Sequence, residues 1–188
     1  MLCIEKYIKE NARKSEAELM KRLWIWLPVL IIAGGIFISS SIPYDKQNIQ
    51  PLLRQYVDKD FFIRWFSWVN FMYGKKEISI ANLGVPAFLE FFIRKGAHFI
   101  SYFVLGFLLS RVLRAFKLKG WRNALLALFL AILYASSDEL HQVFTASRNG
   151  MMLDVWLDGA GAACGILLSL WLFYQRYVSM HVRQRSKT

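Results

Sequence analysis

Between Tyr134 and Gly165 the chain concentrates side chains that can exchange protons, bind ions or make hydrogen bonds. The titratable and amide groups of this stretch are Asp138, Glu139, His141, Gln142, Arg148, Asp154 and Asp158. They lie between the apolar run 124–135 and the small-residue run 159–165. Ionised groups beside membrane-grade apolar segments are costly unless they pair or face a polar cavity. This stretch is therefore the first candidate for a functional site.

Acid and base chemistry is one use for these groups. Asp138 or Glu139 could act with His141 as general acid and base, since carboxyl groups in different environments can have pKa values that are pushed apart. The alternative is a polar network that only holds helix ends together. His98, His141, Asp138 and Asp154 could instead ligate a divalent metal, but no His-x-x-x-His pair and no cysteine ligand supports this. We expect no metal and no cofactor.

Helical spacing groups the polar residues into three stripes, because residues three, four and seven apart share a helix face. The stripes are Lys95, His98 and Tyr102; Tyr134, Asp138, His141 and Gln142; and Asp154 and Asp158 with Gly161 and Gly165. If the stripes face one another, the carboxylates meet Lys95, Arg148 and the histidines, and costly charges are paired. The small residues from Gly161 to Gly165 would let a neighbouring helix approach closely.

The cations and tyrosines of this region have two interpretations each. Lys95 and Arg148 could bind an anionic group such as a pyrophosphate or carboxylate, or they could neutralise Asp138 and Asp154. Tyr102 and Tyr134 could donate hydrogen bonds into a site or could be ordinary aromatic residues of a membrane interface.

The composition indicates that membrane helices position these residues. The chain has 188 residues, of which 56% are hydrophobic and 16% aromatic. Apolar runs near bilayer-spanning length recur, which favours an all-α, polytopic helical bundle over a soluble domain. We expect about four transmembrane helices, at residues 24–42, 99–113, 124–137 and 154–174. The first run could also be a cleaved signal peptide, but its long basic region and long apolar core favour a retained helix.

The distribution of charge predicts the orientation. The net charge is +11, and the basic residues flank the apolar runs instead of forming a nucleic-acid-binding face. Five basic residues crowd positions 111–122, which predicts a cytoplasmic connector. Residues 1–22 and 176–188 would then be cytoplasmic tails, and the membrane domain 23–175 would carry an outer loop region at about 44–93. All three polar stripes would meet at the outer side.

One aromatic segment stands out within the outer loop region. Phe61 to Tyr73 is rich in aromatic residues, too short to span a membrane, and contains Arg64. An interfacial or re-entrant helix fits this composition. The alternative is an aromatic cap packed over the helix ends.

The combined motifs resemble the VanZ-like family of bacterial membrane proteins. The resemblance rests on the order Lys95, His98, Tyr102, then Tyr134 with the Asp-Glu-x-His-Gln motif at 138–142, then Arg148, Asp154 and a glycine-rich helix. The segment Ser39-Ser40-Ser41-Ile42-Pro43 is similar to the close of that family's first helix. The resemblance covers about residues 24–175. The chain departs from the family pattern at Asp158, where Asn is more usual, and at Asn149-Gly150.

This resemblance implies a role in low-level resistance to teicoplanin-type lipoglycopeptides and a location in the bacterial cell membrane. We expect an outer-facing polar site that binds a cell-envelope ligand, either the antibiotic or a lipid-linked cell-wall precursor, and no nucleic acid. Two alternatives stay open. One is a membrane enzyme that acts on an outer-leaflet lipid through carboxylate and histidine groups, and the other is a small proton- or ion-coupled transporter.

Overall fold

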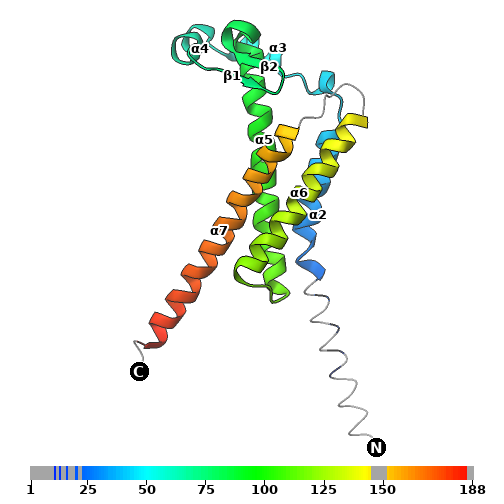
Figure 1. The fold of residues 1–188 in the computed structure, drawn as a ribbon, viewed down its shortest axis with the longest axis vertical. Coiled ribbons are helices and arrows are strands. Elements are labelled where there is room, and N and C mark those ends of the chain that lie inside the picture. The colour runs from blue at the N-terminus through cyan, green and yellow to red at the C-terminus, as the bar shows by residue number, and fades with distance from the viewer. Residues whose placement is uncertain are drawn as a thin grey trace, which may run out of the picture.

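The computed structural model describes residues 23–144 and 152–185, together with the isolated positions 11, 13, 16 and 20. The elements in chain order are α2 (Leu27–Ser41), η1 (Tyr44–Gln47), α3 (Gln50–Tyr56), α4 (Lys59–Phe66), β1 (Asn70–Tyr73), β2 (Lys76–Ser79), α5 (Ile80–Ala115), α6 (Gly120–Phe144) and α7 (Met152–Arg185). Four of these helices form a bundle, and the small elements between α2 and α5 sit at one end of it (Figure 1). We call this the hairpin end.

The protein is a multi-pass helical membrane protein. Helices α5 and α6, and α7 as far as Gln175, are long and apolar enough to cross a membrane. Helix α2 has 15 residues. At 1.5 Å per residue this length is about 22 Å, which is less than the ~30 Å hydrocarbon core. The expected four spans are therefore three full-length helices and one shorter apolar helix.

Helix α2 is shorter than the predicted span 24–42 because of how it begins and ends. Pro28 lies in its first turn, where a missing backbone N–H is tolerated, and residues 25 and 26 form a turn before it. The helix ends before Ile42, which has extended backbone angles. Pro43 follows, and the residue before a proline is disfavoured in a helix.

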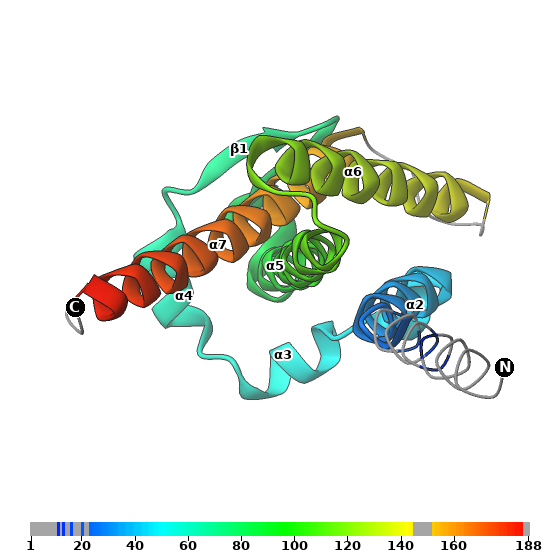
Figure 2. The ribbon, with the colours of Figure 1, turned by 90° about the horizontal axis from the view of Figure 1, so that it is seen from below.

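Helix α5 lies at the centre of the bundle and contacts α2, α6 and α7 (Figure 2). Its contact with α7 is a close backbone approach. A side chain added at Gly161 would collide with the Phe99 carbonyl oxygen, and one added at Gly165 would collide with that of Phe103. Glycine is the residue that allows such an approach. The small-residue motif expected from the sequence therefore sets the distance between α5 and α7.

Helix α5 begins at Ile80, well before the predicted start at residue 99. The Ser79 hydroxyl caps it by accepting a hydrogen bond from the Asn82 N–H at 3.1 Å. The helix is kinked at Gly84, whose φ of 73° is a conformation that glycine adopts readily, and Pro86 follows. Residues 80–93 are thus helical, and the outer loop region predicted at 44–93 is shorter than expected.

The segment Phe61–Tyr73 is not a single helix. Its first part completes α4, which Asp58 caps by accepting from the Asp60 and Phe61 N–H groups. Its last part is β1, which pairs antiparallel with β2 and places Tyr73 opposite Lys76. The predicted all-α fold is corrected accordingly to a mostly helical fold with one β-hairpin.

The hairpin and the short helices form a cap with its own apolar core. Ile78, Ile80, Val85 and Phe88 are buried there, and Phe62, Val69 and Tyr73 pack against them. Part of the aromatic segment thus packs in a cap, while Trp65 and Trp68 are exposed, and its position at the membrane interface stays a prediction.

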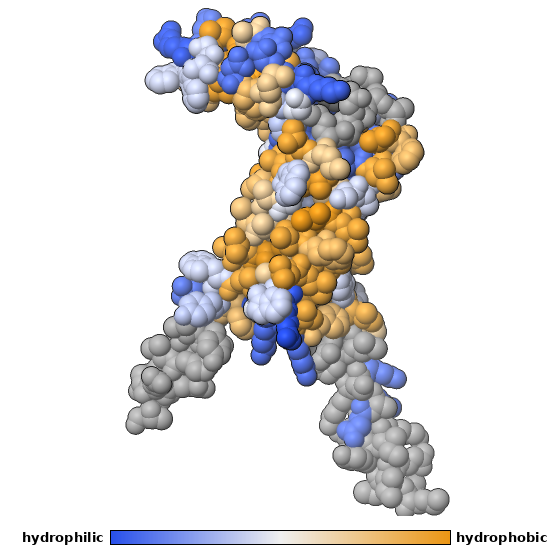
Figure 3. All heavy atoms as spheres, in the orientation of Figure 1, coloured by the Kyte–Doolittle hydropathy of each residue, from blue (hydrophilic) through white to orange (hydrophobic). Residues whose placement is uncertain are grey.

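The outer surface of the bundle is apolar between two hydrophilic ends. On the face seen in Figure 3, hydrophobic residues form a band across the middle, with hydrophilic side chains on the cap above and at the base below. Large apolar side chains such as Leu30, Phe129 and Leu167 are more than half exposed. Such a band suits contact with lipid.

Candidate functional site

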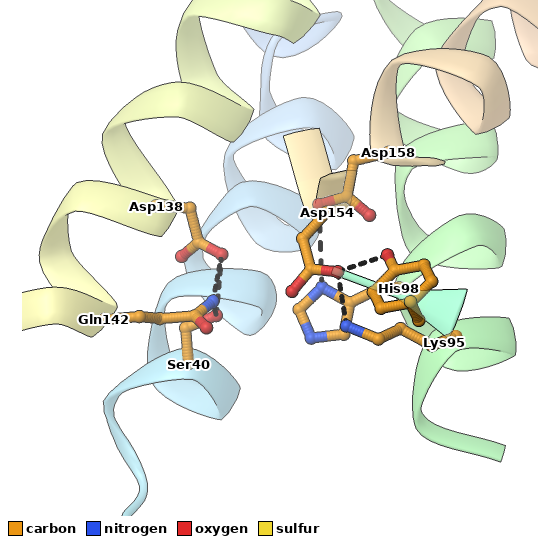
Figure 4. Close-up of polar contacts among 8 residues, drawn as sticks. Ser40, Lys95, His98, Asp138, Gln142, Asp154 and Asp158 are labelled. Atoms are coloured by element: carbon orange, nitrogen blue, oxygen red, sulfur yellow. Dashed lines mark hydrogen bonds and ion pairs between the residues drawn. The ribbon is translucent and has the colours of Figure 1, made fainter. Parts of the chain in front are cut away.

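The first polar group lies between α5 and α7 at the hairpin end. The Lys95 ammonium pairs with Asp154 Oδ1, and both side chains are mostly buried. The hydroxyl of Tyr73 donates to the same oxygen at 2.5 Å. Lys95 also lies 4.9 Å from the centre of the Tyr73 ring, a cation–π distance. One carboxylate therefore joins α5, α7 and the hairpin (Figure 4).

Tyr73 lies outside the membrane-spanning segments. Burial, reinforced by the hydrogen bond to Asp154 and the negative charge of that residue, raises the pKa of Tyr73 above its ordinary value. The phenol therefore stays protonated and acts as a hydrogen-bond donor at neutral pH.

One helical turn deeper, His98 faces Asp158. The distance from His98 Nδ1 to Asp158 Oδ2 is 3.7 Å, which is an electrostatic contact longer than a hydrogen bond. Asp158 is only 4% exposed. Its other oxygen, Oδ1, has no hydrogen-bond partner among the described residues.

The second polar group lies between α2 and α6. Ser40 Oγ donates to Asp138 Oδ2 at 2.8 Å, and Gln142 Nε2 donates to the same oxygen at 3.0 Å. Gln142 Nε2 also donates to Ser40 Oγ at 3.2 Å, which closes a three-residue network (Figure 4). Asp138 is 3% exposed. Its Oδ1 has no hydrogen-bond partner in the described part of the chain.

His141 and Tyr134 also join α2 and α6, one on each side of this network along the helices. His141 Nε2 lies 3.1 Å from Ser41 Oγ, and its ring stacks on Phe37 with centroids 4.6 Å apart. The hydroxyl of Tyr134 donates to the Ala33 carbonyl oxygen at 2.6 Å. Asp138 and His141 thus engage different serines of α2.

Tyr102 connects the two groups. It lies on α5 one turn below His98, is completely buried, and packs beside Tyr134 with ring centroids 6.2 Å apart. Within the described residues its hydroxyl has no hydrogen-bond partner. We call Tyr102, Asp138 and Asp158 the buried polar cluster.

Three oxygens of this cluster share one property: each is buried and each lacks a described partner. They are Tyr102 Oη, Asp138 Oδ1 and Asp158 Oδ1. A buried acceptor without a donor costs roughly 1–3 kcal/mol, and more when it is charged. Such groups are rare enough in folded proteins that each needs an explanation. Here the three atoms belong to α5, α6 and α7, which contact one another.

The residues predicted from the sequence therefore form two linked groups instead of one continuous cup. Lys95 and His98 meet Asp154 and Asp158, whereas Tyr134, Asp138, His141 and Gln142 meet α2. Glu139 follows Asp138 on α6 and is partly exposed. Arg148 lies outside the described residues, and so does its expected pairing with Asp154.

Sequence reasoning did not assign Ser40, Ser41 or Tyr73 to the site. The three serines at 39–41 were a usable signal, because hydroxyl groups at the end of an apolar helix need partners. Tyr73 gave no such signal, since one tyrosine in an aromatic segment does not reveal which element it will contact.

A comparison with known families identifies the chain. The family model described as VanZ/LLP1 matches residues 25–174. The chain belongs to the VanZ/LLP1 family. The match runs from the start of α2 through most of α7 and contains the whole buried polar cluster. Searches of curated proteins and of solved structures each returned no match. The match to this family model confirms the resemblance seen in the sequence.

Proposed function

We propose that this VanZ/LLP1 protein binds a cell-envelope ligand at the buried polar cluster and thereby contributes to resistance against teicoplanin-type lipoglycopeptides. The observation that carries the proposal is that three neighbouring helices each bury a polar oxygen without a partner among the described residues, namely Tyr102 Oη, Asp138 Oδ1 and Asp158 Oδ1. Buried polar groups of this kind mark functional sites within membrane bundles.

The chemistry of the cluster favours a particular kind of ligand. Asp138 Oδ1 and Asp158 Oδ1, which lack partners among the described residues, are acceptors when ionised. The Tyr102 hydroxyl can both accept and donate. Lys95, the described cation of the site, is already paired with Asp154. A ligand that presents hydroxyl, amide or ammonium donors therefore fits better than a phosphate or a carboxylate. Sugar and peptide portions of glycopeptides and of wall precursors offer such donors.

The orientation is part of the proposal. The segment 111–122, which comprises the end of α5, the α5–α6 turn and the start of α6, lies at the end of the bundle opposite the hairpin (Figure 1) and carries Arg111, Arg114, Lys117, Lys119 and Arg122. Connectors this rich in Lys and Arg stay in the cytoplasm. The hairpin end and the cluster would then face the outer side of the cell membrane, where both candidate ligands are found.

A susceptibility series tests this function. A sensitive Gram-positive host would express the wild type, Tyr102→Phe, Asp138→Asn and Asp158→Asn, and Ser137→Ala would serve as the control. Ser137 is exposed, and within the described residues its hydroxyl bonds to the Tyr134 carbonyl oxygen of its own helix. Membrane levels would be matched, and teicoplanin would be compared with vancomycin.

We expect protection against teicoplanin that the control keeps and the three cluster variants lose. Protection that survives in all three variants at normal membrane levels would show that the cluster is not the site. Absence of protection in the wild type would refute the resistance role and leave a search among envelope lipids.

A further inference from the structure

A second candidate binding site lies at the opposite end of the bundle, far from the buried polar cluster. A groove of about 490 Å³ is formed by the end of α5, the α5–α6 turn, the start of α6 and the stretch 170–174 of α7. Its lining residues are Arg114, Lys119, Gly120, Trp121, Leu170, Phe173 and Tyr174. The walls are mostly aromatic and aliphatic. The two charged residues of the lining, Arg114 and Lys119, are both cations.

Arg114 is fixed in this groove. Its guanidinium carbon lies 3.8 Å from the centre of the Phe173 ring, a cation–π contact between α5 and α7. Its Nε is buried and has no hydrogen-bond partner among the described residues. Stacking leaves the edge of a guanidinium group open to an anion, and the planar group of Arg is suited to phosphate.

The turn that brings Lys119 to the groove is held rigidly. Asn123 is fully buried and donates to the Ser110 and Leu118 carbonyl oxygens, at 2.9 and 3.3 Å. Lys117 has a φ of 68°, a conformation normally left to glycine. This left-handed residue ends α5 and turns the chain towards α6.

Charge complementarity determines what fits the groove. The segment 111–122 carries five basic residues and no acidic residue. Within the described residues none of these five cations forms a salt bridge. Figure 3 shows hydrophilic side chains at this end directly below the hydrophobic band. A ligand must therefore combine an anionic group with an apolar part that continues into the membrane.

We propose that this groove binds an anionic phospholipid, with the phosphate at Arg114 and Lys119 and an acyl chain along Trp121, Leu170 and Phe173. Basic pockets between helices at the cytoplasmic side of membranes commonly take such headgroups. The proposal does not depend on the function of the buried polar cluster, because the two sites share no residue.

The test uses the full-length protein in a zwitterionic detergent, with phosphatidylglycerol or phosphatidylcholine added and bound lipid measured by native mass spectrometry. The groove variant is Arg114→Gln with Lys119→Gln. The matched control is Lys75→Gln with Lys76→Gln, which removes the same charge from the exposed hairpin turn. Lys119→Gln alone is included because Lys119 is exposed and its replacement should not disturb folding.

We expect the wild type and the control to bind phosphatidylglycerol similarly, and the double groove variant to bind it roughly tenfold more weakly. The single variant should show a smaller loss. Equal binding of phosphatidylcholine, or equal loss in the control, would overturn the proposal. Displacement of the lipid by inorganic phosphate at equal concentration would also overturn it, because the groove would then be a site for free anions.

Discussion

The hydroxyl of Ser40 donates a 2.8 Å hydrogen bond to Asp138 Oδ2 across 98 residues of sequence. This bond ties α2, the short apolar helix, to α6 at the level of the buried polar cluster. It also fixes which oxygen of Asp138 is occupied, so that Oδ1 remains without a partner among the described residues. The serine-rich end of α2 therefore shapes the site as well as the fold.

Replacing Ser40 should destabilise the protein. Ser40→Ala removes a donor from a buried carboxylate, and we expect a loss of about 1–3 kcal/mol in the free energy of unfolding. Ser137→Ala removes an exposed hydroxyl and should change it by no more than about 0.5 kcal/mol. Unfolding of the detergent-solubilised protein would measure both. Equal stability of the two variants would mean that the hydrogen bond to Asp138 contributes nothing.

The glycines between α5 and α7 should tolerate no side chain. In Gly165→Ala the added carbon meets the Phe103 carbonyl oxygen, so the helices must separate, at a cost of about 1–3 kcal/mol. Gly34→Ala on α2 is the control, since nothing lies within 4 Å of the added carbon. Alanine favours a helix over glycine by up to about 1 kcal/mol, so the control should be neutral or more stable. Thermal melts would separate the two, and a stable Gly165→Ala would contradict the close packing.

The ion pair of Lys95 and Asp154 should show measurable coupling. Both side chains are at most one quarter exposed, so removal of one partner leaves a poorly solvated charge. A double-mutant cycle with Lys95→Met and Asp154→Asn should give an interaction free energy of about 1–3 kcal/mol. Additive effects of the two substitutions would contradict the pairing of Lys95 with Asp154.

Tyr73 should make stability depend on alkaline pH. Its pKa is raised in the folded protein by burial and by Asp154, whereas an unfolded tyrosine titrates near about pH 10. Above that pH the folded state keeps a proton that the unfolded state loses. The contribution of Tyr73 to the free energy of unfolding is therefore fully present below about pH 10 and is lost as the pH rises further.

Tyr73→Phe should therefore reduce the loss of stability above about pH 10, because the titrating phenol is gone. Tyr56→Phe is the control, since Tyr56 is 74% exposed, and it should leave the pH dependence as in the wild type. Unfolding measured across the alkaline range would detect the difference. An identical dependence in both variants would place Tyr73 away from Asp154.

Sequence reasoning was most successful where helical periodicity was strong. The stripe with Lys95 and His98 and the stripe with Asp154 and Asp158 do meet between α5 and α7. It was less successful with the aromatic segment at 61–73. Aromatic residues suit strands as well as buried helices, and a short run has too few positions to show a period. The structure gives a helix followed by a strand there.

Other features depended on contacts between distant parts of the chain. No local pattern indicated that Ser40 would meet Asp138, or that Tyr73 would reach Asp154 across 81 residues. The early start of α5 was missed because Gly84 and Pro86 resemble a loop, although here they produce a kink within a helix. Tertiary packing decided each of these cases.

The most direct test of the buried polar cluster is a binding titration with purified full-length protein in lipid nanodiscs. Labelled teicoplanin and, separately, a lipid-linked wall precursor would be titrated against the wild type, Tyr102→Phe, Asp158→Asn and the Ser137→Ala control. We predict saturable binding of one ligand by the wild type and the control, with affinity lowered roughly tenfold or more in the two cluster variants. Binding that is unchanged in folded cluster variants, or no saturable binding of either ligand, would contradict the proposed site.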